Sequence, residues 1–352
     1  MKRSVYAVCL FSVLLIMEAA ASAAFPSLPP IRSEQNYKWV RASAPGTGCW
    51  PDCVQGQWCW PAACARRGEW PMGVVPLVAF DKLWMISNTA AWSSTDGLHW
   101  KRSGSDAGWG ERYGMPGVFF KNRIWKMGGM EKSWDNFKND VWFSTDGVHW
   151  KRATPRAGWS PRRGHVAVVF NGKLWVLGGA ESSGRRDQLP TRALSDVWSS
   201  TDGMNWERAT ASAPWSGSNN VVVFQDKMWV IGGRGAWSSD DGRVWTKAVS
   251  GAAWLDRGGN GAAGCLVFDG KIWVFGGMDG RGTLNDVWSS SDGVHWQQST
   301  ASAPWAARGA EHSVVFQNKL WIYGGKTGRA DVEDGFGSDV WYMVAAEQRL
   351  TR

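Results

Sequence analysis

The sequence predicts an all-β fold, a six-bladed β-propeller, from three features of the 352-residue chain. The composition includes 28 Trp and 43 Gly, an excess typical of short β units that are repeated many times. The tryptophans recur in a fixed order along the chain. The piece that the last repeat lacks stands near the start of the chain, which indicates a closed ring.

Two sets of tryptophans mark the second and third strands of each repeat. The first set follows a tight turn and mostly runs on into Gly-Gly: Trp84, Trp125, Trp175, Trp229, Trp273 and Trp321. The second set lies in Asp-Val-Trp or takes the same place after Ala: Trp92, Trp142, Trp198, Trp237, Trp288 and Trp341. In the third repeat we therefore expect strands at Val166–Phe170, Lys173–Leu177 and Val197–Ser200.

Two further sets complete the repeat. The third set closes the motif Ser-x-Asp-Gly-x-x-Trp: Trp100, Trp150, Trp206, Trp245 and Trp296. The fourth set follows nine residues later: Trp109, Trp159, Trp215, Trp254 and Trp305. Because Asp-Gly accepts the positive φ angles of a tight primed turn, we expect Asp202-Gly203 to join the third and fourth strands as a hairpin.

The last repeat lacks its fourth strand, and a matching segment stands near the start of the chain. The sixth repeat stops after Asp339–Met343, whereas Tyr37–Arg41 resembles Val148–Arg152. With Trp39 and Trp70 added, four sets of six account for 24 of the 28 tryptophans. We expect the N-terminal strand to complete the last blade, because closing the ring removes exposed sheet edges.

These elements resemble a known family. The Gly-Gly pair, the variable loop, Asp-Val-aromatic and the downstream Trp resemble the kelch repeat, from Tyr37 to Met343. The resemblance implies a galactose-oxidase-like propeller, and bacterial six-bladed members of this kind include periplasmic sialic acid mutarotases. The copper site of kelch-like galactose oxidases, with two Tyr, two His and a crosslinked Cys, is not recognisable here. The Ser-x-Asp-Gly-x-x-Trp motif also resembles the Asp-box of sialidases, from which it departs by one residue.

The N-terminus is typical of a secretory signal peptide, which predicts a secreted or periplasmic protein. Lys2 and Arg3 form a basic region, Val5–Met17 an apolar run, and Ala21-Ser22-Ala23 an A-x-A cleavage site. We expect a signal peptide over 1–23, a linker over 24–36, the propeller over 37–343 with an insert over 43–69, and a tail over 344–352. No later stretch is apolar enough to predict a membrane span.

The net charge and the cysteines give limited information about binding partners. The net charge of +8 becomes +7 when Lys2, Arg3 and Glu18 leave with the signal peptide, which permits an acidic partner. No basic run is long enough to predict nucleic-acid binding. Four cysteines cluster in the insert: Cys49, Cys53, Cys59 and Cys64. In an exported protein this cluster favours two disulfides over a zinc site, with the pairing open, and Cys265 is expected to be a buried thiol.

Loop length points to one face of the propeller. With the strands of a blade lettered a to d, the b–c loops and d–a connections share one face, and the a–b and c–d turns share the other. The b–c loops are long in the second, third, fifth and sixth blades: Met130–Asn139, Ala180–Ser195, Met278–Asn285 and Lys326–Ser338. They are short in the first and fourth blades. Since function concentrates on variable loops, we expect a ligand groove across the b–c/d–a face.

Several charged residues on that face are candidates for chemistry. Four d–a connections share Trp-x-x-Arg: Arg112, Arg162, Arg257 and Arg308. A ring of guanidinium groups could hold a carboxylate or phosphate, or each arginine could tie its blade to a neighbour. His165, His312 and Glu311 are candidate acid–base groups, with hydrogen-bonded histidines lining the channel as the alternative. The histidines of the Asp-Gly-x-His-Trp turns are interpreted as structural: His99, His149 and His295.

One loop aromatic and the absence of catalytic motifs complete the prediction. Trp134 lies in a long b–c loop, where it could stack on a sugar ring or pack within its own loop. No phosphate loop, Gly-x-Ser-x-Gly or His-Glu-x-x-His motif is present, and no metal or cofactor is expected. The leading hypothesis is a monomeric binding module for a glycan or protein ligand, acidic if the arginines take part. The alternatives are a carbohydrate-active enzyme, such as a sialic acid mutarotase-like epimerase, and a structural or assembly protein.

Overall fold

The computed structural model describes residues 37–43, 75–86, 91–104, 107–131, 136–182, 191–215, 217, 220–232, 235–250, 254, 263–279, 281–309, 312–327 and 336–345. All of them belong to one compact unit that spans residues 32–352. Among these residues no helix is long and apolar enough to cross a membrane. The predicted signal peptide and linker, the four clustered cysteines, Trp134, Arg257 and Glu311 lie outside the described residues.

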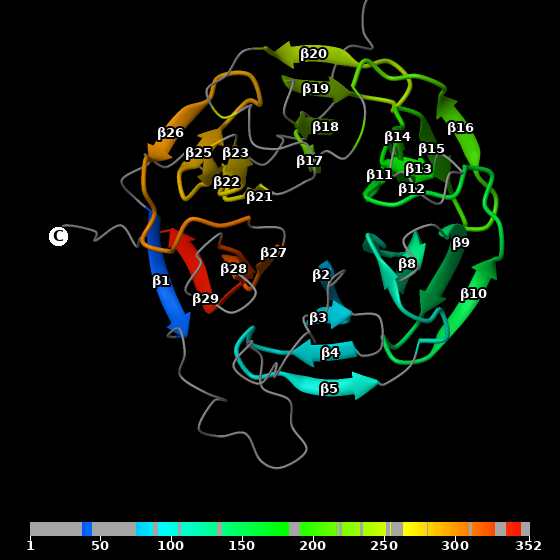
Figure 1. Ribbon diagram of the computed structural model, residues 1–352, viewed down its shortest axis with the longest axis horizontal. Coiled ribbons are helices and arrows are strands. Elements are labelled where there is room, and N and C mark those ends of the chain that lie inside the picture. Colours follow the sequence, from blue (N-terminus) through cyan, green and yellow to red (C-terminus); the bar gives the residue numbers. More distant parts are fainter. Residues whose placement is uncertain are drawn as a thin grey trace, which may run out of the picture. The chain divides into compact units, whose positions relative to one another are not determined.

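Six antiparallel sheets follow one another along the chain and form the blades of a β-propeller (Figure 1). In order a to d, blades 1 to 3 are β2 (Val75–Ala79), β3 (Lys82–Ile86), β4 (Ala91–Ser94) and β5 (Lys101–Gly104); β7 (Gly117–Phe120), β8 (Arg123–Glu131), β9 (Phe137–Ser144) and β10 (Trp150–Thr154); and β11 (Val166–Phe170), β12 (Lys173–Leu177), β15 (Val197–Ser200) and β16 (Glu207–Thr210). A short strand, β6 (Arg112–Tyr113), also pairs with β8 in blade 2.

The second half of the chain repeats the pattern. Blades 4 to 6 are β17 (Asn220–Phe224), β18 (Lys227–Gly232), β19 (Gly235–Ser239) and β20 (Thr246–Val249); β21 (Gly264–Phe268), β22 (Lys271–Phe275), β25 (Val287–Ser290) and β26 (Gln297–Thr300); and β27 (Ser313–Phe316), β28 (Lys319–Lys326), β29 (Phe336–Ala345) and β1 (Tyr37–Ser43). Two small hairpins, β13–β14 (Ala180–Ser182, Thr191–Ala193) and β23–β24 (Met278–Asp279, Gly282–Thr283), stand in the b–c loops of blades 3 and 5.

The ring is closed as predicted. The innermost strands contact one another in a full circle, β2, β7, β11, β17, β21, β27 and back to β2. In blade 6, β1 pairs antiparallel with β29, so that Trp39 lies opposite Met343 and Arg41 opposite Trp341. The N-terminal strand therefore supplies the fourth strand of the last blade, and β29 continues to Ala345, two residues past the predicted end.

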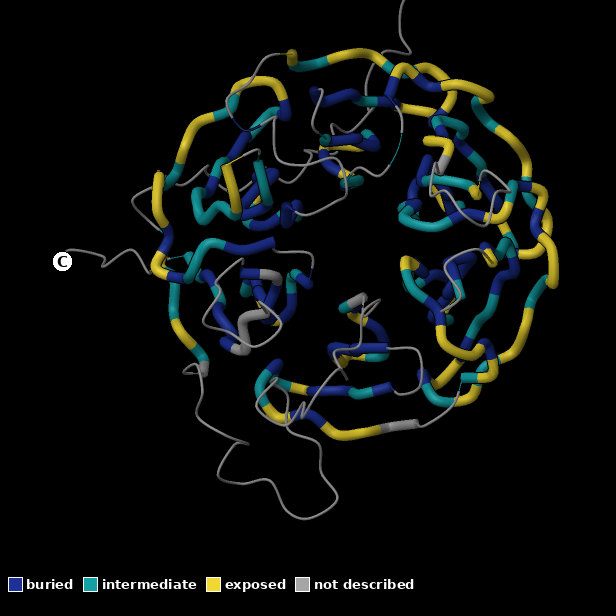
Figure 2. Tube along the Cα trace, in the orientation of Figure 1, coloured by how far each residue is buried: buried dark blue, intermediate teal, exposed yellow. Residues whose placement is uncertain are grey.

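Tryptophans fill the spaces between blades. The strand-b tryptophans are buried, and the outermost strands carry most of the exposed residues (Figure 2). In every blade but the fifth, the strand-b ring lies against the c–d turn of the next blade. A Cβ on Gly203 would lie only 2.1 Å from the ring of Trp125, and Gly203 has a φ of 76°, so a glycine is required at this position. Repetition of this contact explains the Asp-Gly motif.

The structure corrects the predicted turn types. The primed turns, with positive φ at both central residues, are the a–b turns, such as Asn171 (φ 46°) and Gly172 (φ 68°). The c–d connection is a longer loop, because strand c ends at Ser200 and strand d begins at Glu207. Of Asp202 and Gly203, only Gly203 has a positive φ.

Side chains hold the c–d loop in shape. The Ser200 hydroxyl accepts the amide hydrogen of Gly203 at 2.8 Å. The Asp202 carboxylate accepts the amide hydrogens of Met204 and Asn205, each at 2.8 Å. These bonds explain why Ser and Asp recur at fixed positions in the motif.

Candidate functional site

Arg162, one of the predicted ligand-binding arginines, is completely buried in blade 3. Its guanidinium donates to both oxygens of Asp196, at 2.7 and 2.8 Å, and to the carbonyl of Gly178 at 3.0 Å. Burial raises the pKa of Asp196, but the hydrogen bonds and charge of Arg162 outweigh burial and leave that pKa below its ordinary value. Asp196 also accepts the indole N–H of Trp198 at 2.7 Å. The pair therefore links the Gly-Gly end of strand b to the start of strand c.

The same pair recurs in blades 2 and 6. Arg112 is 5% exposed and binds both oxygens of Asp140 and the carbonyl of Gly128. Arg308 is 1% exposed and donates to Asp339 at 2.5 and 3.0 Å. Three of the four predicted arginines thus have a carboxylate partner inside their own blade. This geometry favours the structural alternative over an open ring of guanidinium groups at the channel mouth. The side chain of each arginine links two strands of one blade and does not link two neighbouring blades.

A sequence signal for this role was available in the repeat. Blades 1 and 4 have Gly73 and Ser218 where the others have the arginine, and Ala90 and Gly235 where the others have the aspartate. The two residues are therefore present together or absent together, as expected of partners that would leave a buried charge unpaired if one were lost.

The two candidate histidines are buried behind the loop face. His165 packs against Trp159, with ring centroids 5.6 Å apart. Burial lowers its pKa to about 3, with the charge of Arg162 acting in the same direction. Burial lowers the pKa of His312 to about 4. Both rings are therefore neutral at neutral pH and poorly matched to acid–base work there, which argues against the predicted acid–base role.

Lys126 is a buried charged residue that the sequence analysis missed. It lies in strand b of blade 2 at 1% exposure, and its ammonium donates to the carbonyl of Met115 at 2.8 Å. Burial lowers its pKa to about 7. The signal was a lysine among apolar residues at the equivalent positions of the other blades: Met85, Val176, Val230, Val274 and Ile322.

The loop face has the predicted asymmetry. In blades 2 and 6, strands b and c extend outward as paired strands, to Glu131 and Lys326. In blades 3 and 5 the loops carry the separate hairpins β13–β14 and β23–β24. In blades 1 and 4, strand c resumes shortly after strand b, at Ala91 and Gly235. Four blades therefore present extended loops on this face; the groove predicted between them stays a prediction.

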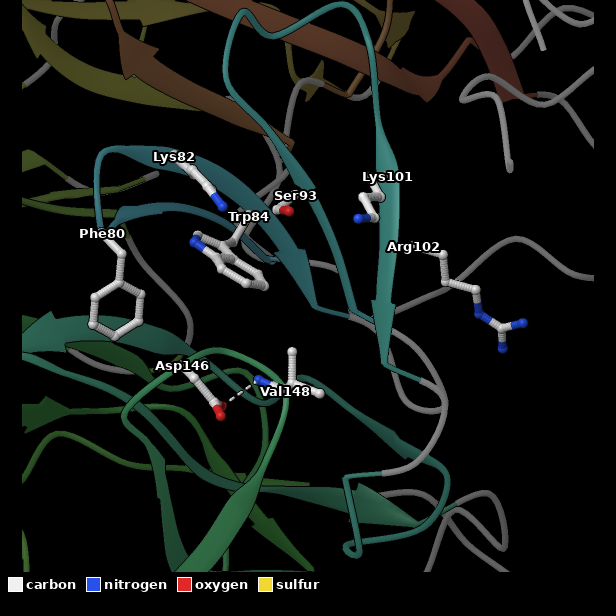
Figure 3. Close-up of a pocket in the computed structure, with 8 residues that line it drawn as sticks. All are labelled: Phe80, Lys82, Trp84, Ser93, Lys101, Arg102, Asp146 and Val148. Carbon is white, nitrogen blue, oxygen red and sulfur yellow. Dashed lines mark hydrogen bonds between the residues drawn. The ribbon is translucent and has the colours of Figure 1, made fainter. Parts of the chain in front are cut away.

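A shallow pocket lies on the opposite face, between blades 1 and 2 (Figure 3). Its volume is about 420 Å³. Phe80 comes from the a–b turn of blade 1, and Lys82 and Trp84 follow on β3, while Lys101 lies on β5. Asp146 and Val148 come from the c–d loop of blade 2. The predicted ligand site lies on the other face, so this pocket was not foreseen from the sequence.

Comparison with known proteins agrees with the fold. Residues 261–289, which include β21, β22 and most of β25, match the kelch motif. The solved structure of YjhT is similar, with a TM-score of 0.59 and 18% identity over 77% of this chain and 94% of that one. No curated protein matches the sequence. At this identity the likeness to YjhT concerns the fold alone, and the resemblance to the kelch repeat is confirmed.

Proposed function

We propose that this kelch-type six-bladed β-propeller is an exported binding protein that holds a glycan or protein ligand on its b–c/d–a face. The observation that carries the proposal is the asymmetry between the two faces. The a–b turns repeat one conformation, whereas four of the b–c loops are extended, two by longer strands and two by separate hairpins, and the other two are short. Variable loops on a rigid repeat are the usual location of recognition residues.

The Arg–Asp pairs fit this proposal as parts of the scaffold that holds the loops. Each described pair lies at the base of an extended loop, because the arginine contacts the carbonyl of the first glycine of the Gly-Gly pair and the aspartate comes directly before Val-Trp of strand c. Because Arg112, Arg162 and Arg308 are neutralised by carboxylates, any preference of this face for acidic ligands has to come from other cations. The predicted export rests on the sequence of residues 1–23.

The experiment begins with a thermal-shift screen of glycans and sugars on the exported protein, followed by loop replacement. Each long b–c loop is replaced in turn by the short loop of blade 4, between Gly232 and Gly235. The control exchanges the c–d loop of blade 3 for that of blade 5. We expect at least one loop replacement to abolish binding while the melting temperature stays close to that of the wild type. If all four replaced proteins bind as the wild type does, the proposal is wrong.

The same experiment addresses the enzyme alternative. If a bound sugar is converted, for example between its anomers, and His312→Val loses turnover but keeps binding, the chain is a carbohydrate-active enzyme. Val166 occupies the equivalent position in blade 3, so this substitution copies a residue that the repeat already tolerates. Binding without conversion assigns the binding module.

A further inference from the structure

The junction between blades 1 and 2 departs from the rest of the ring. At most junctions the first residue of the a–b turn donates a side-chain hydrogen bond to a carbonyl in the next c–d loop. These bonds are Lys121 to Thr201 at 2.9 Å, Asn171 to Asp240 at 3.3 Å, Gln225 to Ser291 at 3.0 Å and Gln317 to Thr95 at 2.6 Å. Blade 1 has Phe80 at this position, which carries no donor for the matching carbonyl of Thr145.

The residue before Phe80 departs from the repeat as well. Strand a ends in phenylalanine in five blades but in Ala79 in blade 1: Phe120, Phe170, Phe224, Phe268 and Phe316. The ring of Phe80 takes over this packing role and meets Trp84 at 6.5 Å and Phe119 at 5.0 Å between centroids. Its φ of 53° is a backbone conformation that bulky residues rarely adopt. One aromatic residue replaces both a core ring and a hydrogen-bonding residue, and the pocket lies at this junction.

The pocket combines flat apolar surface with positive charge. Figure 3 shows the ammonium groups of Lys82 and Lys101 on two sides of the Trp84 ring, with Phe80 to one side of it. In blades 2 and 6 the cation that opens strand b lies over a strand-c ring, 4.5 Å from Phe143 and 4.7 Å from Tyr342. Blade 1 has Ser93 at that place, as blades 3 to 5 also have serine, so no strand-c ring faces Lys82.

The one carboxylate in the pocket wall is committed to its own loop. Asp146 accepts the amide hydrogens of Val148 and His149, each at 2.8 Å, and the ring N–H of His149 at 2.7 Å. Burial raises the pKa of Asp146, but these hydrogen bonds outweigh burial and leave the pKa well below its ordinary value. Two lysines and Arg102, whose side chain points away from the pocket in Figure 3, outnumber this single carboxylate. The pocket wall therefore has net positive charge and favours an anion.

We propose that this pocket binds an acidic saccharide. The C–H face of a sugar ring lies against Phe80 and Trp84, its carboxylate or sulfate meets Lys82 and Lys101, and its remaining hydroxyls stay in water because the pocket is shallow. The site is on the opposite face from the extended loops. It is therefore independent of the proposed ligand of those loops.

The test is calorimetric titration of the exported protein with trigalacturonate and with its methyl ester, which lacks the charge. We expect binding of the acid alone, weakened by added salt. Lys82→Gln should weaken it about fivefold, the upper range for an exposed ion pair. Lys173→Gln removes the matching lysine of blade 3 and should leave affinity unchanged.

A second variant removes the pocket and spares the fold. Ala79→Phe with Phe80→Asn copies Phe170-Asn171 of blade 3 and restores both the core ring and the donor. We expect this double variant to lose binding with an equal or higher melting temperature. Absence of binding to the wild type, equal binding of the methyl ester, or equal losses in the Lys82 and Lys173 variants would overturn the proposal. Loss of binding only on replacement of a b–c loop would also overturn it, and would support the loop-face function instead.

Discussion

Blades 2, 3 and 6 contain a buried Arg–Asp pair, whereas blades 1 and 4 have neither residue. The same division separates long b–c loops from short ones. The pair is therefore not a requirement of a blade, since two blades of the same ring are built without it. It accompanies the extended loops, at whose bases it lies.

The backbone of the arginine adds a second link, to the preceding blade. The amide of Arg162 donates to the carbonyl of Lys138, and its carbonyl accepts from the amide of Gly129, both in blade 2. The backbone of Arg308 makes the matching bonds to Leu284 and Gly277 in blade 5. One residue thus holds the base of its own loop through the side chain and the base of the neighbouring loop through the backbone. Because this hydrogen-bonding geometry is repeated at the loop bases, the loop tips can differ without disturbing the blades.

The largest effect is expected when one member of a pair is removed. Asp196→Ala leaves the guanidinium of Arg162 buried without its carboxylate and should lower the free energy of unfolding by about 3–5 kcal/mol. The double variant Arg162→Ser with Asp196→Ala combines the serine of blade 4 with the alanine of blade 1, and it should cost clearly less. Urea unfolding of both variants measures the difference. Equal losses in the two variants would show that the pair acts through something other than charge compensation.

Lys126 provides a second comparison, between blade 2 and the five blades with an apolar residue at that position. Burial depresses its pKa from 10.5 to about 7, so the folded state binds fewer protons than the unfolded state between these values. Wild-type stability should therefore rise as pH rises from about 7 to 10.5. Lys126→Met, which copies Met85, should stabilise the protein by roughly 4 kcal/mol at pH 7 and lose most of that advantage near pH 10. A pH-independent difference would contradict the assignment.

The strands could be predicted from the local sequence because the same pattern occurs six times in the chain. Strands a, b and c of blade 3 have the predicted bounds, and β1 closes the ring where Trp39 suggested. Trp39 also makes the aromatic contact of its set: its ring centroid lies 5.8 Å from that of Trp305, as the centroid of Trp150 lies 4.7 Å from that of Trp109. The c–d turn was mistaken because the Asp-Gly dipeptide indicates a positive φ without showing which side chains fold back onto the loop.

The candidate site was harder to predict, for a different physical reason. A buried Arg and an exposed Arg have the same local sequence, and only the partner distinguishes them, here 34 residues away in Asp196. The pocket beside Phe80 depends on two residues that differ from the repeat and on a loop of the next blade. Departures from a repeat are visible in the sequence, but what they leave open becomes visible only in the packed structure.

Acidification tests the third comparison, between His165 in blade 3 and Met115, which holds the same place after the blade-2 arginine. Because burial depresses the pKa of His165 from 6.5 to about 3, the unfolded chain binds more protons in this window. Stability should fall as pH falls from 6.5 towards 3. His165→Met should be more stable than the wild type by about 3 kcal/mol at pH 4 and nearly equal at pH 7.5. The His165→Met variant should keep part of this pH dependence of stability, because burial also lowers the pKa of His312, to about 4.

The smallest expected effect concerns blade 6, the one blade made from two ends of the chain. It has no Asp-Gly loop to cover the strand-b tryptophan of blade 5, and Tyr37 covers Trp273 in its place, with ring centroids 4.7 Å apart. The Tyr37 hydroxyl donates to Asp269 at 2.9 Å, at the turn position where other blades use Asn171 or Gln225. Tyr37→Phe keeps the ring and removes this hydrogen bond, so the free energy of unfolding should fall by about 1 kcal/mol. Tyr37→Ala, which also removes the ring contact, should cost several times more, measured by urea unfolding. Equal effects of the two substitutions would mean that the hydroxyl, and not the ring, closes the propeller.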